Sequence, residues 1–301
     1  MDRSIYSIVK MIAVVIHAVD PQEGKKNMFS FSRKTDYSET VLKDALRLME
    51  AGVLVVPDKN CIKAYSKGLV VIDKLTERNH FFDNIEKFTE IISRGMPADK
   101  ERMTLQKIAM ANMTFDEDKF SVCGWKTALG EMDIRVPRLD DEKKYKKPEI
   151  DLVMVNPSKR EMILVEYKCK GESVIGARQN IAQQGIDYMQ ILYSNHMSEI
   201  RDELLNAYNV YRKIKSMPEL PKDTYNEYRV KVGFLFVDKI YENGVVVSEI
   251  TEDYYKKGME LLNSNCQYLG DNLVYIRART LENVRFDEWK TVRDSDFMVT
   301  I

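Results

Sequence analysis

The residues most able to do chemistry in this 301-residue chain are Asp151, Glu166 and Lys168, all within residues 148–170. Apolar stretches on either side of a polar turn that begins at Asn156 predict a β-hairpin. A loop of two or four residues places Asp151 directly opposite Glu166, whereas a loop of three or five residues shifts that pairing by one. Opposite side chains have Cβ atoms roughly 4.5–5.5 Å apart, which lets two carboxylates bind one cation.

Lys168 follows Glu166 by two residues and therefore projects from the same face of its strand. Like charges opposite each other on a largely buried strand destabilise it unless a cation or a lysine compensates them. Carboxylate oxygens bind hard cations, so the cation expected here is Mg²⁺ or Mn²⁺ rather than Zn²⁺. An edge hairpin whose charged face is simply solvated is the alternative interpretation.

The hydrophobic pattern around this hairpin predicts an α/β domain whose sheet has helices on both faces, in the order αβββαβ. The predicted elements are a helix at residues 98–113, strands at 127–136, 149–156 and 161–170, a helix at 172–193, a second helix, and a strand at 229–238. A strand from Gly244, a helix at 254–262 and a strand at 273–278 are expected to extend the same domain.

Turn residues at 95–97 mark the clearest break, which separates an N-terminal α+β region, residues 1–95, from residues 96–301. The signals in the first region are a capping box at Asp36 and Glu39, a helix end at Gly52, and apolar strands from Val53 and Gly68. This order loosely resembles a winged helix. An extension that packs against the second region is the alternative.

The composition is that of an ordinary globular chain, with 44% apolar and 31% charged residues. A net charge of −1 excludes a strongly basic protein, so any nucleic-acid surface must be local. Four dispersed cysteines predict neither structural zinc nor a disulfide framework, which fits a reducing, cytoplasmic location. The apolar stretch at residues 5–19 is too short to span a bilayer and is interpreted as a buried element rather than a signal peptide, so no membrane partner is expected.

The hairpin residues resemble the PD-(D/E)xK nuclease superfamily. In that superfamily an Asp begins one strand, and Glu or Asp, any residue and Lys follow on the next strand; the matching residues here are Asp151, Glu166, Tyr167 and Lys168. The resemblance covers about residues 98–238. It implies a restriction-endonuclease-like core, with residues 96–301 as a nuclease-like domain, and metal-dependent hydrolysis of phosphodiester bonds in nucleic acid, with DNA as the expected substrate.

The resemblance also implies roles for these residues. Asp151, Glu166 and the backbone carbonyl of Tyr167 would bind Mg²⁺ or Mn²⁺, which lowers the pKa of a bound water. Lys168 would orient that water or stabilise the charge that develops on the phosphate. Independently of the resemblance, the basic residues Lys170 and Arg178 are expected to contact phosphates.

A run of basic residues is also expected to contact phosphates; it consists of Lys143, Lys144, Lys146 and Lys147. The alternative interpretation is a solvated loop.

Gln184 and Tyr188 share one face of the predicted helix at 172–193 with apolar residues, so Gln184 is a polar residue in a core-facing stripe. The pair resembles the Gln-x-x-x-Tyr signature of RecB-like nucleases, in which that helix face borders the metal site and the DNA backbone. A glutamine at the margin of the stripe, bonded to backbone, is the alternative.

Three upstream acids could add a metal ligand: Glu101 on the helix at 98–113, and Glu131 or Asp133 on the following strand. A solvated glutamate in the first helical turn is the alternative for Glu101. The short connection to Glu166 favours Asp151 over Asp133 as the central aspartate, because a direct hairpin needs no insertion.

Other catalytic signatures are absent from the sequence, including a phosphate-binding GxxxxGK[ST] loop, a GxSxG elbow and an HExxH helix. The main competing hypothesis is a noncatalytic nucleic-acid-binding or protein-interaction module on the same fold.

Overall fold

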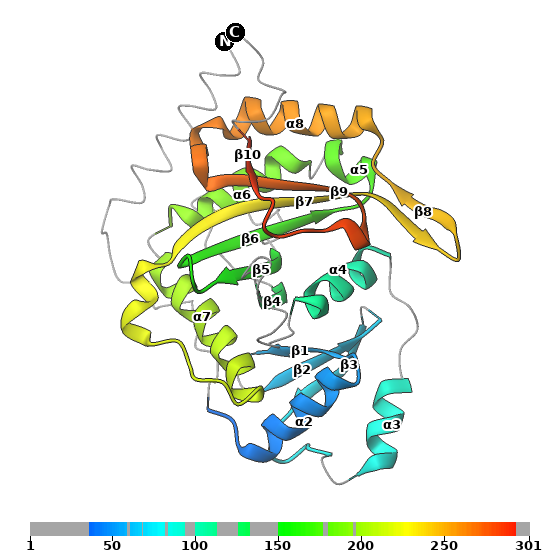
Figure 1. Cartoon of the computed structure of the whole chain (residues 1–301), viewed down its shortest axis with the longest axis vertical. Helices are drawn as coiled ribbons and strands as arrows, with labels where there is room; N and C mark the ends of the chain where they lie inside the picture. The colour runs from blue at the N-terminus through cyan, green and yellow to red at the C-terminus, as the bar shows by residue number, and fades with distance from the viewer. Residues whose placement is uncertain are drawn as a thin grey trace, which may run out of the picture.

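The computed structural model describes residues 36–58, 61–67, 69–81, 84–93, 100–112, 126–132, 150–176, 180–194 and 197–292. These residues form a three-stranded sheet and a seven-stranded mixed sheet with helices on both faces (Figure 1). The predicted element at residues 5–19 and the basic run at 143–147 lie outside the described residues.

The large sheet has the strand order β10-β9-β7-β6-β5-β4, and β8 pairs with the far end of β7. Neighbours from β4 to β6 are antiparallel, whereas β6, β7 and β9 run parallel to one another. The strands are β4 (Lys126–Met132), β5 (Ile150–Asn156), β6 (Glu161–Lys168), β7 (Arg229–Glu242), β8 (Val245–Glu249), β9 (Leu273–Thr280) and β10 (Lys290–Thr291).

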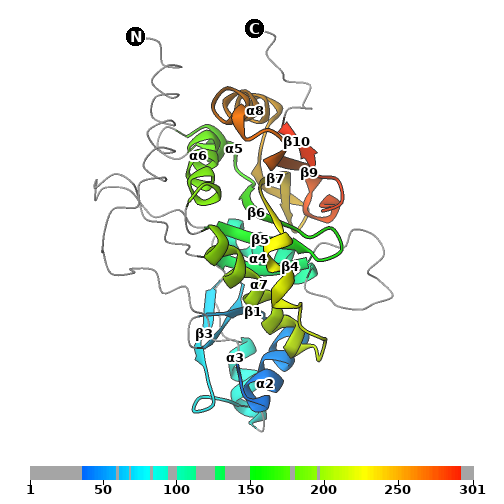
Figure 2. The same cartoon turned by 90° about the vertical axis from the view of Figure 1, so that its left-hand side faces the viewer.

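Helices cover both faces of this sheet, as Figures 1 and 2 show. One face carries α5 (Gly171–Ile175), α6 (Ile181–Leu192) and α8 (Glu252–Cys266), and the other carries α4 (Lys100–Ala111) and α7 (Met197–Ile214). Short 3₁₀ helices complete the domain: η2 (Lys222–Glu227), η3 (Gln267–Asn272) and η4 (Leu281–Asn283). The predicted α/β class, with a mixed sheet flanked by helices, is confirmed.

The single helix predicted at residues 172–193 is wrong, because the chain forms two helices there. Gly176 leaves the helical conformation with a ψ of 148°. Asn180 then begins α6 as its N-cap, and its side-chain oxygen accepts a hydrogen bond from the Gln183 N–H at 2.9 Å. The apolar period continues across the break, so periodicity alone did not reveal it.

The N-terminal region forms its own small sheet. Its elements are α2 (Glu39–Glu50), β1 (Leu54–Pro57), β2 (Ile62–Ser66), β3 (Leu69–Leu75) and α3 (Ile85–Ser93). The helix end at Gly52 is confirmed, with a φ of 81°. The capping box is wrong: Ser38 is the N-cap, it makes no side-chain capping bond, and Asp36 lies outside the helix. Strand β2 was not predicted, because its apolar pattern is only Ile62 and Ala64.

This small sheet packs against the lower face of the large sheet in Figure 1, through α4 and α7. The Tyr211 O–H of α7 donates a hydrogen bond to the Val55 carbonyl of β1 at 2.6 Å. Gln106 of α4 donates one to the Tyr65 carbonyl of β2 at 3.0 Å. Buried apolar residues of the two sheets form one continuous core. None of the described helices combines the length and apolarity needed to cross a bilayer.

Asp44 anchors the segment after β3 to α2, which makes it a test of the N-terminal packing. The residue is fully buried, and its Oδ2 accepts a hydrogen bond from the Phe81 N–H at 2.5 Å. Burial raises the pKa of Asp44, although this bond and the charges of His80, Arg47 and Lys87 oppose the shift. Asp44→Ala should cost about 1–3 kcal/mol in urea unfolding, because the buried Phe81 N–H loses its acceptor.

Asp44→Asn is the matched control, because it keeps the acceptor and removes the charge. A carboxyl whose pKa is raised in the folded state makes the free energy of unfolding fall as pH rises above its ordinary value of about 4. The stability of Asp44→Asn relative to the parent should therefore increase from pH 4 to pH 7. Equal losses in the Ala and Asn variants at pH 7 would contradict this assignment.

Candidate functional site

The β5–β6 hairpin has the register that a four-residue loop requires. Next to the loop, Asn156 pairs with Glu161, and at the other end of the ladder Leu152 pairs with Val165. One step further, the same register sets Asp151 opposite Glu166, as the sequence predicts for an even loop. The loop, residues 157–160, closes with a left-handed residue, Arg160, at a φ of 51°.

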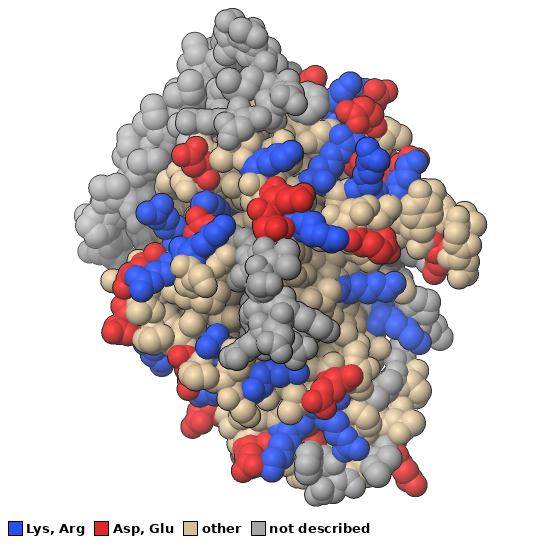
Figure 3. All heavy atoms as spheres, in the orientation of Figure 1, with Lys and Arg blue, Asp and Glu red and all other residues tan. Residues whose placement is uncertain are grey.

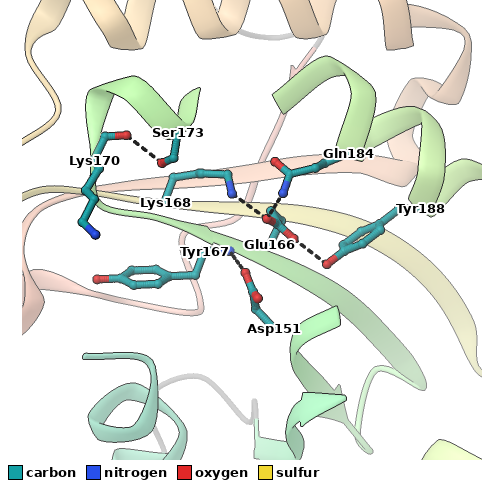
Figure 4. Close-up of polar contacts among 8 residues, drawn as sticks. All are labelled: Asp151, Glu166, Tyr167, Lys168, Lys170, Ser173, Gln184 and Tyr188. Atoms are coloured by element: carbon teal, nitrogen blue, oxygen red, sulfur yellow. Dashed lines mark hydrogen bonds and ion pairs between the residues drawn. The ribbon is translucent and has the colours of Figure 1, made fainter. Parts of the chain in front are cut away.

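Glu166 is the centre of a buried polar cluster (Figure 4). Glu166 and Lys168 are each only 4% exposed, and the Lys168 ammonium donates to Glu166 Oε1 at 2.5 Å. The Gln184 amide donates to the same oxygen, and the Tyr188 O–H donates to Oε2 at 2.6 Å. Gln184 and Tyr188 of α6 therefore both contact Glu166. A buried carboxylate with three donors is strongly held in one orientation.

Close packing of α6 against α8 brings these two side chains to the sheet. A Cβ atom on Gly185 would lie 2.9 Å from the Cys266 sulfur of α8, so a larger residue here would force the two helices or the Cys266 side chain to shift. Gln184 precedes that glycine, and Tyr188 follows it by one turn. The backbone of α6 therefore places both donors above the end of β6.

Asp151 lies where the β5–β6 pairing ends. Its Oδ2 accepts a hydrogen bond from the Tyr167 N–H at 2.9 Å. Burial raises the pKa of Asp151 well above its ordinary value, and the nearby charge of Glu166 raises it further, while Lys168 acts in the opposite direction. A buried carboxyl group beside a second carboxylate forms a site that a cation would stabilise.

Lys168 retains its charge in this cluster. Burial alone would lower the pKa of Lys168, but the attraction of Glu166 and Asp151 outweighs burial and holds that pKa above its ordinary value. The ammonium is therefore a fixed positive charge in a water-poor environment. Such a charge acts most strongly on an anion that enters the same environment.

Helix α4 supports the site from the opposite face of the sheet. The Tyr167 O–H donates to the Thr104 hydroxyl at 2.9 Å, and that hydroxyl donates to the Glu101 carbonyl at 2.9 Å. Glu101 is partly buried, and its charge contributes to the raised pKa of Asp151. Glu101 is thus within electrostatic range of Asp151. The Tyr167–Thr104 contact was not predicted, because no local pattern connects residues so distant in the chain.

The sheet register also bears on the other upstream acids. Gly130 and Met132 of β4 pair with Leu152 and Ile150 of β5, so the backbone of Glu131 lies opposite Asp151. Three acidic positions, at residues 131, 151 and 166, therefore occupy one row across neighbouring strands. The Glu131 side chain and the whole of Asp133 lie outside what the structure describes.

Of the expected phosphate contacts, Lys170 lies between β6 and α5, and Arg178 falls outside the described residues. The Lys170 carbonyl accepts a hydrogen bond from the Ser173 hydroxyl at 2.7 Å (Figure 4). Its ammonium makes no hydrogen bond or ion pair with any described residue. Lys170 is therefore a partly buried cation at the strand end that carries Lys168.

The side chains that the structure describes include no group of three His, Cys, Asp or Glu residues arranged to bind a metal. The described carboxylates at the site are the pair Asp151 and Glu166, with Glu101 nearby. One acceptor is left over: Gln184 Oε1 is buried and has no hydrogen-bond partner. An unsatisfied buried acceptor is costly, and a donor supplied by a ligand or a bound water would remove that cost.

No protein-family model, no curated protein and no solved structure matches this chain. A function for it therefore depends on the geometry of its own residues.

The Tyr188 hydroxyl should contribute measurably to the cluster. Tyr188→Phe removes one donor from Glu166 and keeps the ring, so the loss should be about 1.5–3 kcal/mol in urea unfolding, as for a hydrogen bond to a charged group. Tyr193→Phe is the matched control, because Tyr193 ends the same helix and is 49% exposed. Equal stability of the two variants would show that the hydroxyl of Tyr188 does not hold Glu166.

Proposed function

We propose that this chain is a metal-dependent nuclease of the PD-(D/E)xK type, which hydrolyses phosphodiester bonds of DNA. One observation carries the proposal: the hairpin register sets Asp151 opposite Glu166, beside the buried ammonium of Lys168. Acidic pairs on a buried sheet are destabilising in themselves. A cation and an anionic substrate would turn that arrangement into a binding site.

The donor set fits Mg²⁺ or Mn²⁺. The carboxylates of Asp151 and Glu166, with the backbone carbonyl of Tyr167, would hold the ion, and the repulsion that raises the pKa of Asp151 would be relieved. When bound, such an ion supplies Lewis acidity toward the phosphate and lowers the pKa of an attacking water. Glu131 is the upstream acid that the strand register favours as a further ligand.

The protein's own groups would do the remaining work. Lys168 is charged and buried, so it can stabilise negative charge as it develops on the phosphate. Gln184 and Tyr188 hold Glu166 in one orientation, which reduces the reorganisation needed when the ion binds. Lys170 can contact a neighbouring phosphate from the same strand end.

The element order supports a restriction-endonuclease-like core. Helix α4 precedes the antiparallel strands β4, β5 and β6, and α6 then leads, through α7, to the parallel strand β7. This is the αβββαβ order expected from the sequence. The acids stand in the middle of this unit, with helices on both faces of the sheet.

DNA binding would depend on local contacts. On the face in Figure 3, basic and acidic side chains alternate over the described residues, without a continuous basic surface. This distribution agrees with the net charge of −1. A small number of phosphate contacts gives a shallow dependence of affinity on salt, with a slope of about −0.9 per contact.

The proposal is tested by incubating the full-length protein with labelled single-stranded, double-stranded and branched DNA and RNA, in Mg²⁺, in Mn²⁺ and in EDTA. We expect cleavage of at least one DNA substrate with either ion and none in EDTA. Calorimetric titration should show Mn²⁺ binding that competes with Mg²⁺. A protein that binds neither ion and cleaves no substrate would refute the proposal.

A noncatalytic nucleic-acid-binding or protein-interaction module is the second candidate, and one observation favours it. Glu166 already accepts three hydrogen bonds from protein donors, so the cluster is coherent without a metal. Such a module would show no Mn²⁺ binding that depends on Asp151. The same titration therefore separates the two candidates.

A further inference from the structure

A pocket lies at the end of the sheet that also carries Lys168. Its volume is about 660 Å³, within the range of small-ligand sites. It lies at the carboxyl ends of the parallel strands β7 and β9, near the first residue of α8 and beside η4. The lining residues that matter here are Tyr241, Arg279, Lys239 and Asn283.

The two acidic residues of this pocket share one arginine. The Arg277 guanidinium donates to both carboxylate oxygens of Asp238, at 2.9 and 3.1 Å, and to Glu252 at 2.7 Å. It also stacks over the Tyr255 ring, 3.8 Å from the ring centre. This network fixes Arg277 as a structural cation and offsets one of the two carboxylate charges, so an anion would need the further cations of the pocket.

Two further cations remain at the pocket. Arg279 is exposed and makes no hydrogen bond or ion pair with any described residue. Lys239 pairs with Glu249 at 3.2 Å, but both side chains are more than 40% exposed, and such surface pairs exchange readily for other partners. The pocket lining therefore includes one guanidinium without a described partner and one ammonium in an exposed ion pair.

A nucleotide base also needs a flat apolar surface on which to stack, and the ring of Tyr241 provides one. It stands in the β7–β8 hairpin, which projects from the molecule on the right of Figures 1 and 3. The hairpin turns through Asn243 and Gly244, both with positive φ. Tyr241 is 51% exposed although it lines the pocket. An exposed aromatic ring beside basic side chains is the combination that binds unstacked bases.

The register relates this pocket to the candidate active site. Lys168 pairs with Phe236, and Phe236 pairs with Arg277, so these three residues form one row across the sheet. Arg279 is two residues further along β9. Strand spacings of about 4.8 Å and a rise of about 3.3 Å per residue put the backbones of Lys168 and Arg279 on the order of 12 Å apart. A few nucleotides, at about 3.4 Å per stacked phosphate, cover that distance.

We propose that this pocket binds an unpaired nucleotide of the substrate strand, with its base stacked on Tyr241 and its phosphate on Arg279 and Lys239. The proposal rests on the proposed nuclease function for the position of the strand at Lys168. A base can stack on a side chain in this way only when it has left the duplex. The preferred substrates are therefore single-stranded or frayed ends rather than intact duplex.

The test measures binding without cleavage, by fluorescence anisotropy of the full-length protein in EDTA. The probes are a labelled oligothymidine and a blunt duplex of equal length. Tyr241→Ala should weaken single-strand binding by at least about fivefold, the loss expected from one base stack, whereas Tyr241→Phe should retain it. Arg279→Gln should weaken binding and reduce the salt slope by about one.

Two controls separate this pocket from general surface effects. Val245→Ala alters the same hairpin at a residue that is 64% exposed and does not line the pocket, and Lys257→Gln removes an exposed charge from α8. Both should bind like the parent. Parental affinity in Tyr241→Ala and Arg279→Gln, equal losses for duplex and single strand, or no binding of oligothymidine by the parent would overturn the proposal.

These outcomes are distinct from failure of the nuclease assignment. A protein that cleaves DNA through Lys168, but binds oligothymidine independently of Tyr241 and Arg279, would retain the proposed function and lose this pocket. A protein that binds oligothymidine through both residues and never cleaves would retain the pocket and lose the nuclease assignment.

Discussion

Lys168→Ala should reduce DNA cleavage by about 10²-fold to 10³-fold while Mn²⁺ binding is retained. The size of the loss follows from removing a preorganised charge from a water-poor site. The ammonium donates to Glu166 at 2.5 Å and is 4% exposed, so solvent cannot replace it. It is not itself a metal ligand. Single-turnover cleavage assays and calorimetric titration with Mn²⁺ measure the two quantities separately.

Folding must be controlled in this comparison, because Lys168 is buried among acids. Thermal melts in EDTA and in Mn²⁺ should accompany the assays. Lys170→Ala is the matched control, since Lys170 is a nearby cation outside the hydrogen-bonded cluster, and its removal should cost affinity rather than the chemical step. Full activity in a well-folded Lys168→Ala protein would show that the lysine has been assigned the wrong role.

Asp151→Asn should lose both Mn²⁺ binding and cleavage, and it should stabilise the metal-free protein. The amide oxygen can still accept the Tyr167 N–H, so the hairpin end is retained. The charge that burial and Glu166 disfavour is removed, so the melting temperature in EDTA should rise. About 2–4 °C is expected for each kcal/mol gained in a chain of this size. In Mn²⁺ the parent should have the higher melting temperature, because only the parent gains stability from metal binding.

Asp253→Asn provides the control for charge alone. Asp253 is exposed in the first turn of α8, away from the hairpin, so its neutralisation should change neither Mn²⁺ affinity nor cleavage. Metal affinity and cleavage should be measured with Mg²⁺ and with Mn²⁺ for the parent, Asp151→Asn and Asp253→Asn. Mn²⁺ binding to Asp151→Asn with the parental affinity would remove Asp151 from the proposed ligand set.

The hairpin illustrates where sequence reasoning succeeded. The parity of a short loop decides which residues face each other, so the sequence predicted Asp151 opposite Glu166 for an even loop, and the four-residue loop of the structure gives that register. The 3.6-residue period then placed Gln184 and Tyr188 on one helix face. Both inferences depend on local geometry, which neighbouring residues determine.

The errors have a common physical origin. The helix predicted at 172–193 is broken at Gly176, where a continuous apolar period concealed a change of direction. Strand β2 has too few apolar residues to be distinguished, and it is stabilised by its neighbours β1 and β3. In each case packing against elements elsewhere in the chain decided the outcome.

By itself, the sequence determined the α/β class, the core hairpin, and the residue types able to bind a hard cation. Only the tertiary structure decided that Glu166 accepts three protein donors, that the row of acids includes position 131, and that Tyr241 and Arg279 share a pocket near the end of β6. The reason is distance along the chain. Period and loop length act over a few residues, whereas these groupings join segments tens of residues apart, and their positions depend on how helices and strands pack.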